Sequence, residues 1–236
     1  KLQRINVNGN NLTTLPPEIG NLTQLEYLFV TNNKLTSLPP EIGGLVSLKE
    51  LYLFDNQLSS LPPEIGNCTN LKHLNINRNN LTSLPPEIGN LQVLVELYLD
   101  NNLLETIPPE IGNLSEYLGG LQLDNNQLTS LPYELMQLTK LCYYDAGECF
   151  SFCNNNICDD FVDTARSDML LWMQGYIFDW IYCQDCGNVL TKETLSSNSF
   201  TLEVYPNPFT NSVTLSIGGN KPENRKLKEG IRIYNM

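Results

Sequence analysis

The sequence predicts an α/β solenoid over residues 1–151, with a parallel sheet on its concave face and short helical or 3-10 turns on its convex face. Two observations in the 236-residue chain carry this prediction. A phrase that opens with leucine recurs every 23 residues, and each copy holds one strand-like and one helix-like segment. About seven copies are present, starting at Leu2, Leu25, Leu48, Leu71, Leu94, Leu118 (after one extra residue) and, in decayed form, Leu141.

The first half of each copy predicts a short strand. In the second copy the alternation of Leu28, Phe29 and Val30 places the two aliphatic side chains inward and Phe29 outward. A single copy cannot bury its own apolar face, so the strands must stack in parallel. An asparagine follows each strand, where its amide can bond the backbone of the turn and of the neighbouring copy. We interpret these residues as a structural ladder: Asn10, Asn33, Asn56, Asn79, Asn102 and Asn126, with Cys149 at the same position of the last copy.

The second half of each copy predicts a short helical turn. Its apolar residues are spaced by three and four positions, and Pro16 and Pro17 precede Ile19 in the first copy. Proline tolerates the first turn of a helix because the missing N–H would have no partner there. Glu18 lies in the same turn, where free N–H groups favour a carboxylate.

The complete phrase is Leu-x-x-Leu-x-Leu-x-x-Asn-x-Leu followed by Thr-Ser-Leu-Pro-Pro-Glu-Ile-Gly-Asn-Leu, as over residues 71–91. It resembles the leucine-rich repeat, in its short class with a Leu-Pro-x-x-Ile second half. The resemblance covers residues 1–151 and implies the same solenoid that the pattern predicts.

Side chains at outward strand positions do not pack in the core, so their identity can vary to form a ligand-binding site. Five aromatic residues, the single histidine and several carboxylates fall on these positions. Exposed aromatic groups with a polar surround are typical of recognition surfaces, although stacked aromatics can also simply cover a sheet. We expect a protein or glycan ligand to contact Tyr27, Phe29, Glu50, Tyr52, Phe54, His73, Asn75, Tyr98, Asp100, Gln122 and Asp124, with Asp145 as the outward residue of the last copy.

Nothing in the sequence indicates catalysis. His73 has no serine or cysteine nucleophile at a recognisable spacing, and no second histidine exists to build a hydrolytic zinc site. Carboxylates such as Glu50 and Asp100 would lie on an open sheet that does not exclude water. We expect a non-enzymatic protein that requires no cofactor and no catalytic metal.

Cysteines mark a separate segment after the repeats. Cys68 takes a slot that leucine fills in other copies, which predicts a buried apolar residue. Residues 152–190 are predicted to cap the solenoid, with a helix over residues 159–182. Six cysteines near this cap are candidates for disulfides, whereas the four in Cys153-x4-Cys158 and Cys183-x2-Cys186 could instead hold zinc. The six are Cys142, Cys149, Cys153, Cys158, Cys183 and Cys186.

In the C-terminal part, the sequence predicts a linker over residues 191–199 and an incomplete β-sandwich-like unit over residues 200–236. This unit resembles the C-terminal sorting domain of type IX (Por) secretion substrates from Bacteroidetes. The resemblance rests on three sequence segments: Val204-Tyr-Pro-Asn-Pro-Phe-Thr210, Ser212–Ile217 and Ile231–Asn235. That resemblance implies contact with export machinery and a location outside the cell or on the outer-membrane surface. The family's domain continues beyond this point, so the segment is expected to be truncated.

Composition narrows the possible partners. A formal net charge of −12 disfavours nucleic acid, and the longest apolar run is too short to span a bilayer. The favoured hypothesis is a secreted or cell-surface binding module that recognises a protein or glycan on its concave face. An alternative is an intracellular scaffold that resembles Ras-suppressor adaptors, and a third is a targeting arm for a catalytic domain elsewhere in a longer chain.

Overall fold

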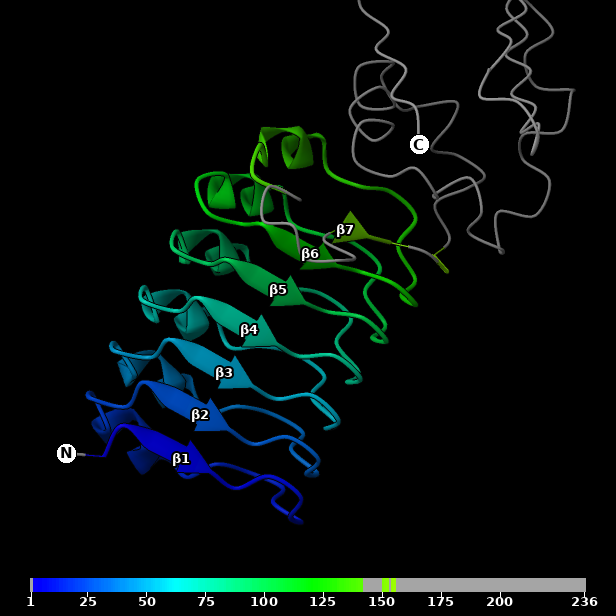
Figure 1. The fold of residues 1–236 in the computed structure, drawn as a ribbon. Helices are drawn as coiled ribbons and strands as arrows, with labels where there is room; N and C mark the ends of the chain where they lie inside the picture. The colour runs from blue at the N-terminus through cyan, green and yellow to red at the C-terminus, as the bar shows by residue number, and fades with distance from the viewer. Residues whose placement is uncertain (1, 142–149, 153, 156–236) are drawn as a thin grey trace, which may run out of the picture. The chain divides into compact units, whose positions relative to one another are not determined.

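The computed structural model describes residues 2–141, 150–152 and 154–155. These residues alternate short β-strands with short 3-10 helices, one of each in the first six repeats, and end with a seventh strand (Figure 1). The strands are β1 (Arg4–Asn6), β2 (Tyr27–Phe29), β3 (Glu50–Tyr52), β4 (His73–Asn75), β5 (Glu96–Tyr98), β6 (Gly120–Gln122) and β7 (Phe150–Ser151). The helices are η1 (Pro17–Asn21), η2 (Pro40–Gly44), η3 (Pro63–Asn67), η4 (Pro86–Asn90), η5 (Pro109–Leu114) and η6 (Tyr133–Gln137).

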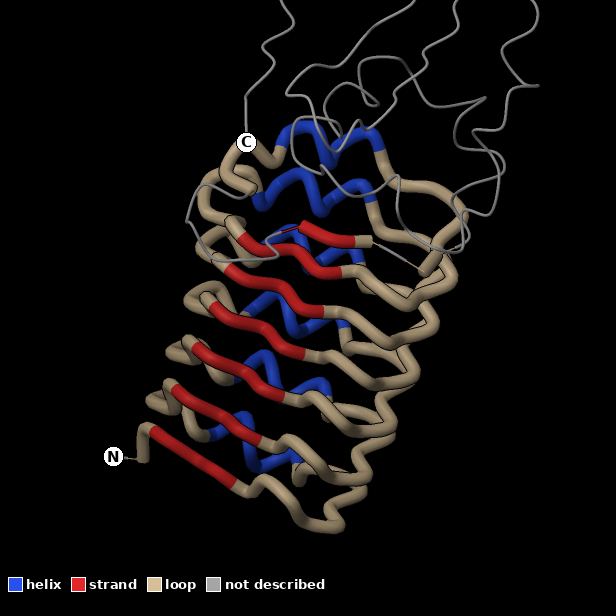
Figure 2. The backbone as a smooth tube through the Cα atoms, turned by 45° about the vertical axis from the view of Figure 1, so that its right-hand side comes forward, coloured by secondary structure: helices blue, strands red, loops and turns tan. Residues whose placement is uncertain are grey.

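The strands form one parallel sheet in chain order, from β1 to β7. The register follows the sequence period, since Leu28 pairs with Leu51 and Leu51 pairs with Leu74. The helices lie in a second layer behind the sheet, and loops join the two layers at both sides (Figure 2). The predicted solenoid, with a parallel sheet and short 3-10 turns, is therefore confirmed for the described residues.

The last repeat begins later than the sequence pattern indicated. Phe150 of β7 pairs with Leu121 of β6, which is a step of 29 residues (150 minus 121) instead of 23. Phe150 and Phe152 are buried, with ring centroids 5.5 Å apart, and they take the inward positions that Leu121 and Leu123 hold in the preceding repeat. The large apolar rings of Phe150 and Phe152 fill these positions, and Asn155 follows at the ladder spacing. A copy that starts at Leu141 would instead place Ala146 in one of the two inward positions.

Two expectations about the last repeat change as a result. The outward position of β7 is Ser151, which pairs with Gln122, and not Asp145. The ladder position is Asn155, whose amide nitrogen donates to the carbonyl oxygens of Leu123 and Phe152, and not Cys149. The solenoid thus reaches residue 155, beyond the boundary at residue 151 that the sequence suggested.

Proline is the first residue of η1–η5, as predicted, and precedes the first residue of η6. In η1 the chain enters through Pro16 in an extended conformation, Pro17 takes the first helical position and Glu18 lies in the first turn. The amide of Ile19 donates to the carbonyl oxygen of Pro16 at 3.0 Å, and the amide of Leu22 donates to that of Ile19 at 3.1 Å. Bonds of this three-residue span define a 3-10 helix, which fits one turn into each repeat.

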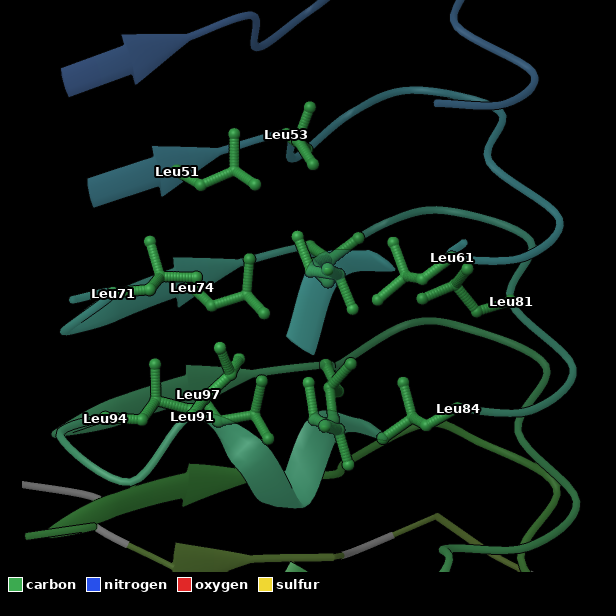
Figure 3. Packing of buried hydrophobic residues seen from close by; sticks show 14 of the residues in the cluster. Leu51, Leu53, Leu61, Leu71, Leu74, Leu81, Leu84, Leu91, Leu94 and Leu97 are labelled. Atoms are coloured by element: carbon green, nitrogen blue, oxygen red, sulfur yellow. The ribbon is translucent and has the colours of Figure 1, made fainter. Parts of the chain in front are cut away.

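Aliphatic side chains from the strands and helices fill the space between the two layers. Leu51, Leu74 and Leu97 follow one another on neighbouring strands and are at most 1% exposed (Figure 3). Cys68 is also fully buried, which confirms its predicted apolar role, and burial raises the pKa of its thiol to about 12. The core is thus continuous from one repeat to the next, as stacking requires.

The remaining C-terminal predictions lie outside the described residues. These are the cap over residues 152–190, apart from Phe152, Asn154 and Asn155, and also the linker and the partial sorting domain. The six cysteines predicted as candidates for disulfides or a zinc site also lie outside the described residues.

Candidate ligand-binding surface

The face of the sheet that points away from the helices presents three rows of side chains, which we call the open face. The parallel register aligns equivalent residues of successive repeats, so each row crosses the strands. Row one is Arg4, Tyr27, Glu50, His73, Glu96 and Gly120, and row two is Asn6, Phe29, Tyr52, Asn75, Tyr98, Gln122 and Ser151. Row three lies two residues beyond row two in each repeat and comprises Asn8, Thr31, Phe54, Asn77, Asp100 and Asp124.

All eleven residues predicted to contact a ligand lie in these rows, and all are half-buried. Their inward neighbours on the strands, such as Leu28 and Leu51, are fully buried. The alternation of a pleated strand therefore places the predicted residues on the open face.

An aromatic cluster occupies the first three strands. The rings of Phe29 and Tyr52 have centroids 5.0 Å apart on neighbouring strands, and Tyr27 lies 6.5 Å from Phe29. The guanidinium carbon of Arg4 lies 4.6 Å from the centre of the Tyr27 ring and 5.5 Å from that of Phe29. These distances suit aromatic pairing and cation–π attraction, which hold the rings in place on the sheet.

Arg4 was missing from the predicted site. Its position one period before Tyr27 places it in row one, so the repeat period was the signal that could have identified it. We define Arg4, Tyr27, Phe29 and Tyr52 as the aromatic cluster.

Hydrogen-bonded carboxylates occupy the centre of the open face. His73 Nδ1 lies 2.9 Å from Glu96 Oε2 across β4 and β5. Glu96 also lies on the same strand as Tyr98, two residues before it, and Glu50 is placed in the same way relative to Tyr52. Burial, together with the charge and hydrogen bond of Glu96, raises the pKa of Tyr98 to about 12. Burial and Glu50 raise the pKa of Tyr52 in the same direction, so both tyrosines are neutral donors at physiological pH.

Row three links its strands through backbone contacts. The amide of Asp100 donates to Asn77 Oδ1 at 3.0 Å, and the amide of Asp124 donates to Asp100 Oδ1 at 3.1 Å. These bonds orient the side chains of Asn77 and Asp100 along the sheet. Asp100 and Asp124 therefore add two carboxylates to one end of the open face.

The structure divides the aromatic residues that the sequence grouped together. Tyr52 and Tyr98 are separated along row two by Asn75, and Tyr98 takes part in none of the ring contacts among the described residues. His73 pairs with a carboxylate. The open face thus has an aromatic part on β1–β3 and a polar part on β4–β6.

The described residues offer no metal site. No group of three or more histidine, cysteine, aspartate or glutamate side chains in this part of the chain could hold a metal ion. Within the same residues, no helix has the length and hydropathy that a membrane span needs. The chemistry available on the open face is aromatic contact, hydrogen bonding and negative charge.

Comparisons with known families agree with the fold. One family model, described as a leucine-rich repeat region, matches residues 41–143, and another, described as a leucine rich repeat, matches residues 1–58. A comparison with curated proteins found no match.

Solved structures of similar proteins come from a bacterium and from plants. A leucine-rich repeat protein of Leptospira interrogans has a TM-score of 0.50 and 39% identity, over 65% of this chain and 43% of that protein. The plant peptide hormone receptor RGFR1 in complex with RGF2 has a TM-score of 0.56 and 39% identity, over 59% of this chain and 23% of the receptor.

A third similar structure is the ectodomain of the Arabidopsis thaliana receptor kinase GASSHO1/SCHENGEN3 in complex with CASPARIAN STRIP INTEGRITY FACTOR 2. It has a TM-score of 0.50 and 35% identity, over 59% of this chain and 20% of the ectodomain. This chain spans less than half the length of each of the three proteins.

Proposed function

Residues 1–143 consist of leucine-rich repeats, and we propose that they form a non-enzymatic module that binds a protein or peptide on the open face. The aromatic cluster is the observation that carries this proposal. Its rings are only half-buried, and in the described part of the chain the helices lie on the other side of the sheet. Aromatic side chains fixed by neighbours contribute contact area at a low entropic cost when a partner covers them.

Two of the similar structures support a peptide or protein ligand over other classes. Both plant proteins are receptors determined in complex with a second molecule, and one is named a peptide hormone receptor. The repeat architecture that they share with this chain offers an extended sheet face for such contacts.

A selection from random peptides tests the proposal directly. Twelve-residue peptides displayed on phage would be selected on the immobilised 236-residue chain, and the enriched peptides would then be measured on variants. We expect Tyr52→Ala and Phe29→Ala each to weaken binding by about tenfold or more, as is typical of central aromatic contacts.

Tyr133→Ala is the matched control, because this tyrosine is 39% exposed and belongs to η6, in the helical layer. It should leave binding unchanged. Circular dichroism would verify that all variants keep their fold. Equal binding by the three variants, or enrichment of no peptide at all, would overturn the proposed function.

Export to the cell surface is the second part of the proposal. The Tyr205-Pro-Asn-Pro-Phe209 motif and the cysteine-rich segment, both outside the described residues, support an extracellular module with disulfides. Antibody detection after fractionation of the producing cells should find the solenoid in the medium or the outer membrane.

Alkylation with and without reductant provides an independent readout of this location. We expect the six cysteines near the predicted cap to react only after reduction. Six thiols that react before reduction, together with detection in the cytoplasm, would favour the intracellular scaffold instead.

A further inference from the structure

The open face is polarised along the direction in which the repeats stack. On β1–β3 its three rows hold four aromatic residues and the cation Arg4, with Glu50 as the one carboxylate. On β4–β6 the same rows hold three carboxylates and no lysine or arginine, and His73 is paired with one of the carboxylates. The three carboxylates are Glu96, Asp100 and Asp124.

The carboxylates at the β5–β6 end are held in place by neighbouring groups. Glu96 Oε2 lies 2.9 Å from His73 Nδ1, and Asp100 Oδ1 accepts from the amide of Asp124. Oriented carboxylates lose little freedom when a cation arrives, so they favour a lysine or arginine of a ligand. Arg4 at the other end repels such a cation, which fixes the end at which it binds.

We propose that the open face binds an extended peptide that carries an aromatic or aliphatic residue four positions away from a lysine or arginine; this inference rests on the proposed function. The apolar residue packs on the aromatic cluster, and the basic residue lies among Glu96, Asp100 and Asp124. The peptide backbone crosses the strands along the stacking direction.

The spacing follows from strand geometry. The middle of the aromatic part, between β2 and β3, and the middle of the acidic part, between β5 and β6, are three strands apart. At about 4.8 Å per strand this separation is about 14 Å, and an extended peptide covers it in about four residues. Residues four apart also point to the same side of an extended chain, so both can face the sheet.

Peptides from the phage selection provide the first test. Those whose binding depends on Tyr52 should be enriched in an apolar residue and a lysine or arginine at this spacing. A synthetic twelve-residue peptide with Phe and Lys four apart would then be compared by fluorescence anisotropy with two controls. In one control Glu replaces Lys, and in the other the two residues are three apart.

We expect about tenfold weaker binding for the Glu control and a loss of several-fold for the shorter spacing, with an affinity that falls as salt rises. The double variant Asp100→Asn, Asp124→Asn should bind the Phe–Lys and Phe–Glu peptides with similar affinity. Asparagine is close to aspartate in size and keeps an acceptor oxygen for the backbone bond, so the fold is retained.

The outcomes separate this inference from the proposed function. Peptides that depend on Tyr52 but show no preference for a basic residue, or none for the spacing, would overturn the inference and leave the function standing. An absence of peptides that depend on Tyr52 would overturn both. Equal discrimination by the double variant and the unchanged chain would also contradict the inference.

Discussion

The ladder asparagines from Asn33 onward each bond two repeats at once. Asn79 accepts from the amide of Leu58 at 2.9 Å and donates to the carbonyl oxygens of Leu53 and Ile76 at 3.0 and 3.1 Å. The side chain is 5% exposed, so water does not substitute for these bonds. Asn10 differs, because it is exposed and donates only to Val7 and Asn8 of its own repeat.

Asn79→Ala should lower the free energy of unfolding by about 2–4 kcal/mol, since it leaves buried backbone groups of two repeats without partners. Asn10→Ala should cost less than about 1 kcal/mol, because water can reach the groups that it exposes. Urea denaturation followed by circular dichroism would measure both variants. A similar loss for the two substitutions would argue against the ladder as a link between repeats.

Tyrosine ionisation should also destabilise the fold. The pKa of Tyr98 is about 12 in the folded chain and about 10 in the unfolded chain. The folded state therefore holds a proton that the unfolded state has lost, and stability should fall as pH rises from about 10 to 12. Ultraviolet titration of tyrosinate should show a late component near pH 12 that Tyr98→Phe removes. Titration of all tyrosines near pH 10 would contradict this assignment.

At the scale of elements, glycine determines how closely the 3-10 helices stack. A β-carbon built on Gly66 of η3 would lie 2.6 Å from the carbonyl oxygen of Glu87 in η4. Gly20, Gly43, Gly89 and Gly112 face the next helix in the same way. The glycine of the Pro-Pro-Glu-Ile-Gly phrase is thus required by backbone contact between repeats.

Gly66→Ala should destabilise the chain by about 1–3 kcal/mol, because the helices must separate to admit the methyl group. Gly120→Ala is the matched control, since the nearest atoms to its β-carbon would be side-chain atoms of Glu96 and Tyr98, at 3.4 and 3.6 Å, with the Glu96 α-carbon at 3.9 Å. Thermal denaturation should show a clear decrease in Tm for the first variant and little change for the second. An unchanged Tm for Gly66→Ala would show that the stacking is looser than the structure indicates.

At the scale of the whole solenoid, each repeat gains most of its stability from its two neighbours. Leu51 and Leu74 in the middle are at most 1% exposed, whereas Leu2 in the first repeat is 53% exposed. Ile5 and Val7 of that repeat are only partly buried. The first repeat should therefore open more readily than the central ones.

Hydrogen exchange should reveal this gradient. The Val7 amide, which donates to Phe29, should exchange faster than the Leu53 and Ile76 amides, which donate to Asn75 and Tyr98. The difference should shrink as denaturant raises the population of the globally unfolded chain. Equal protection at the three amides under native conditions would indicate that the solenoid unfolds only as a single unit.

The sequence alone determined the repeating architecture. The 23-residue period, the alternation around Leu28 and the proline before each helix predicted the parallel sheet and the 3-10 turns, because these patterns act within one repeat and its neighbours. The same alternation placed every predicted ligand residue on one face. The last repeat was misplaced by six residues, because the 23-residue period predicted inward positions at Tyr144 and Ala146, whereas Phe150 and Phe152 take them.

Only the tertiary structure decided how the outward residues group. Sequence position put Tyr98 with the aromatic residues, but the register pairs it with Asn75 and Gln122, which carry no ring, while Arg4 joins Tyr27 and Phe29. Such contacts depend on which residues of neighbouring strands pair in the register and on the orientation of each side chain. A period in the sequence therefore predicts the rows of the open face, but the division into an aromatic and an acidic part follows from contacts in three dimensions.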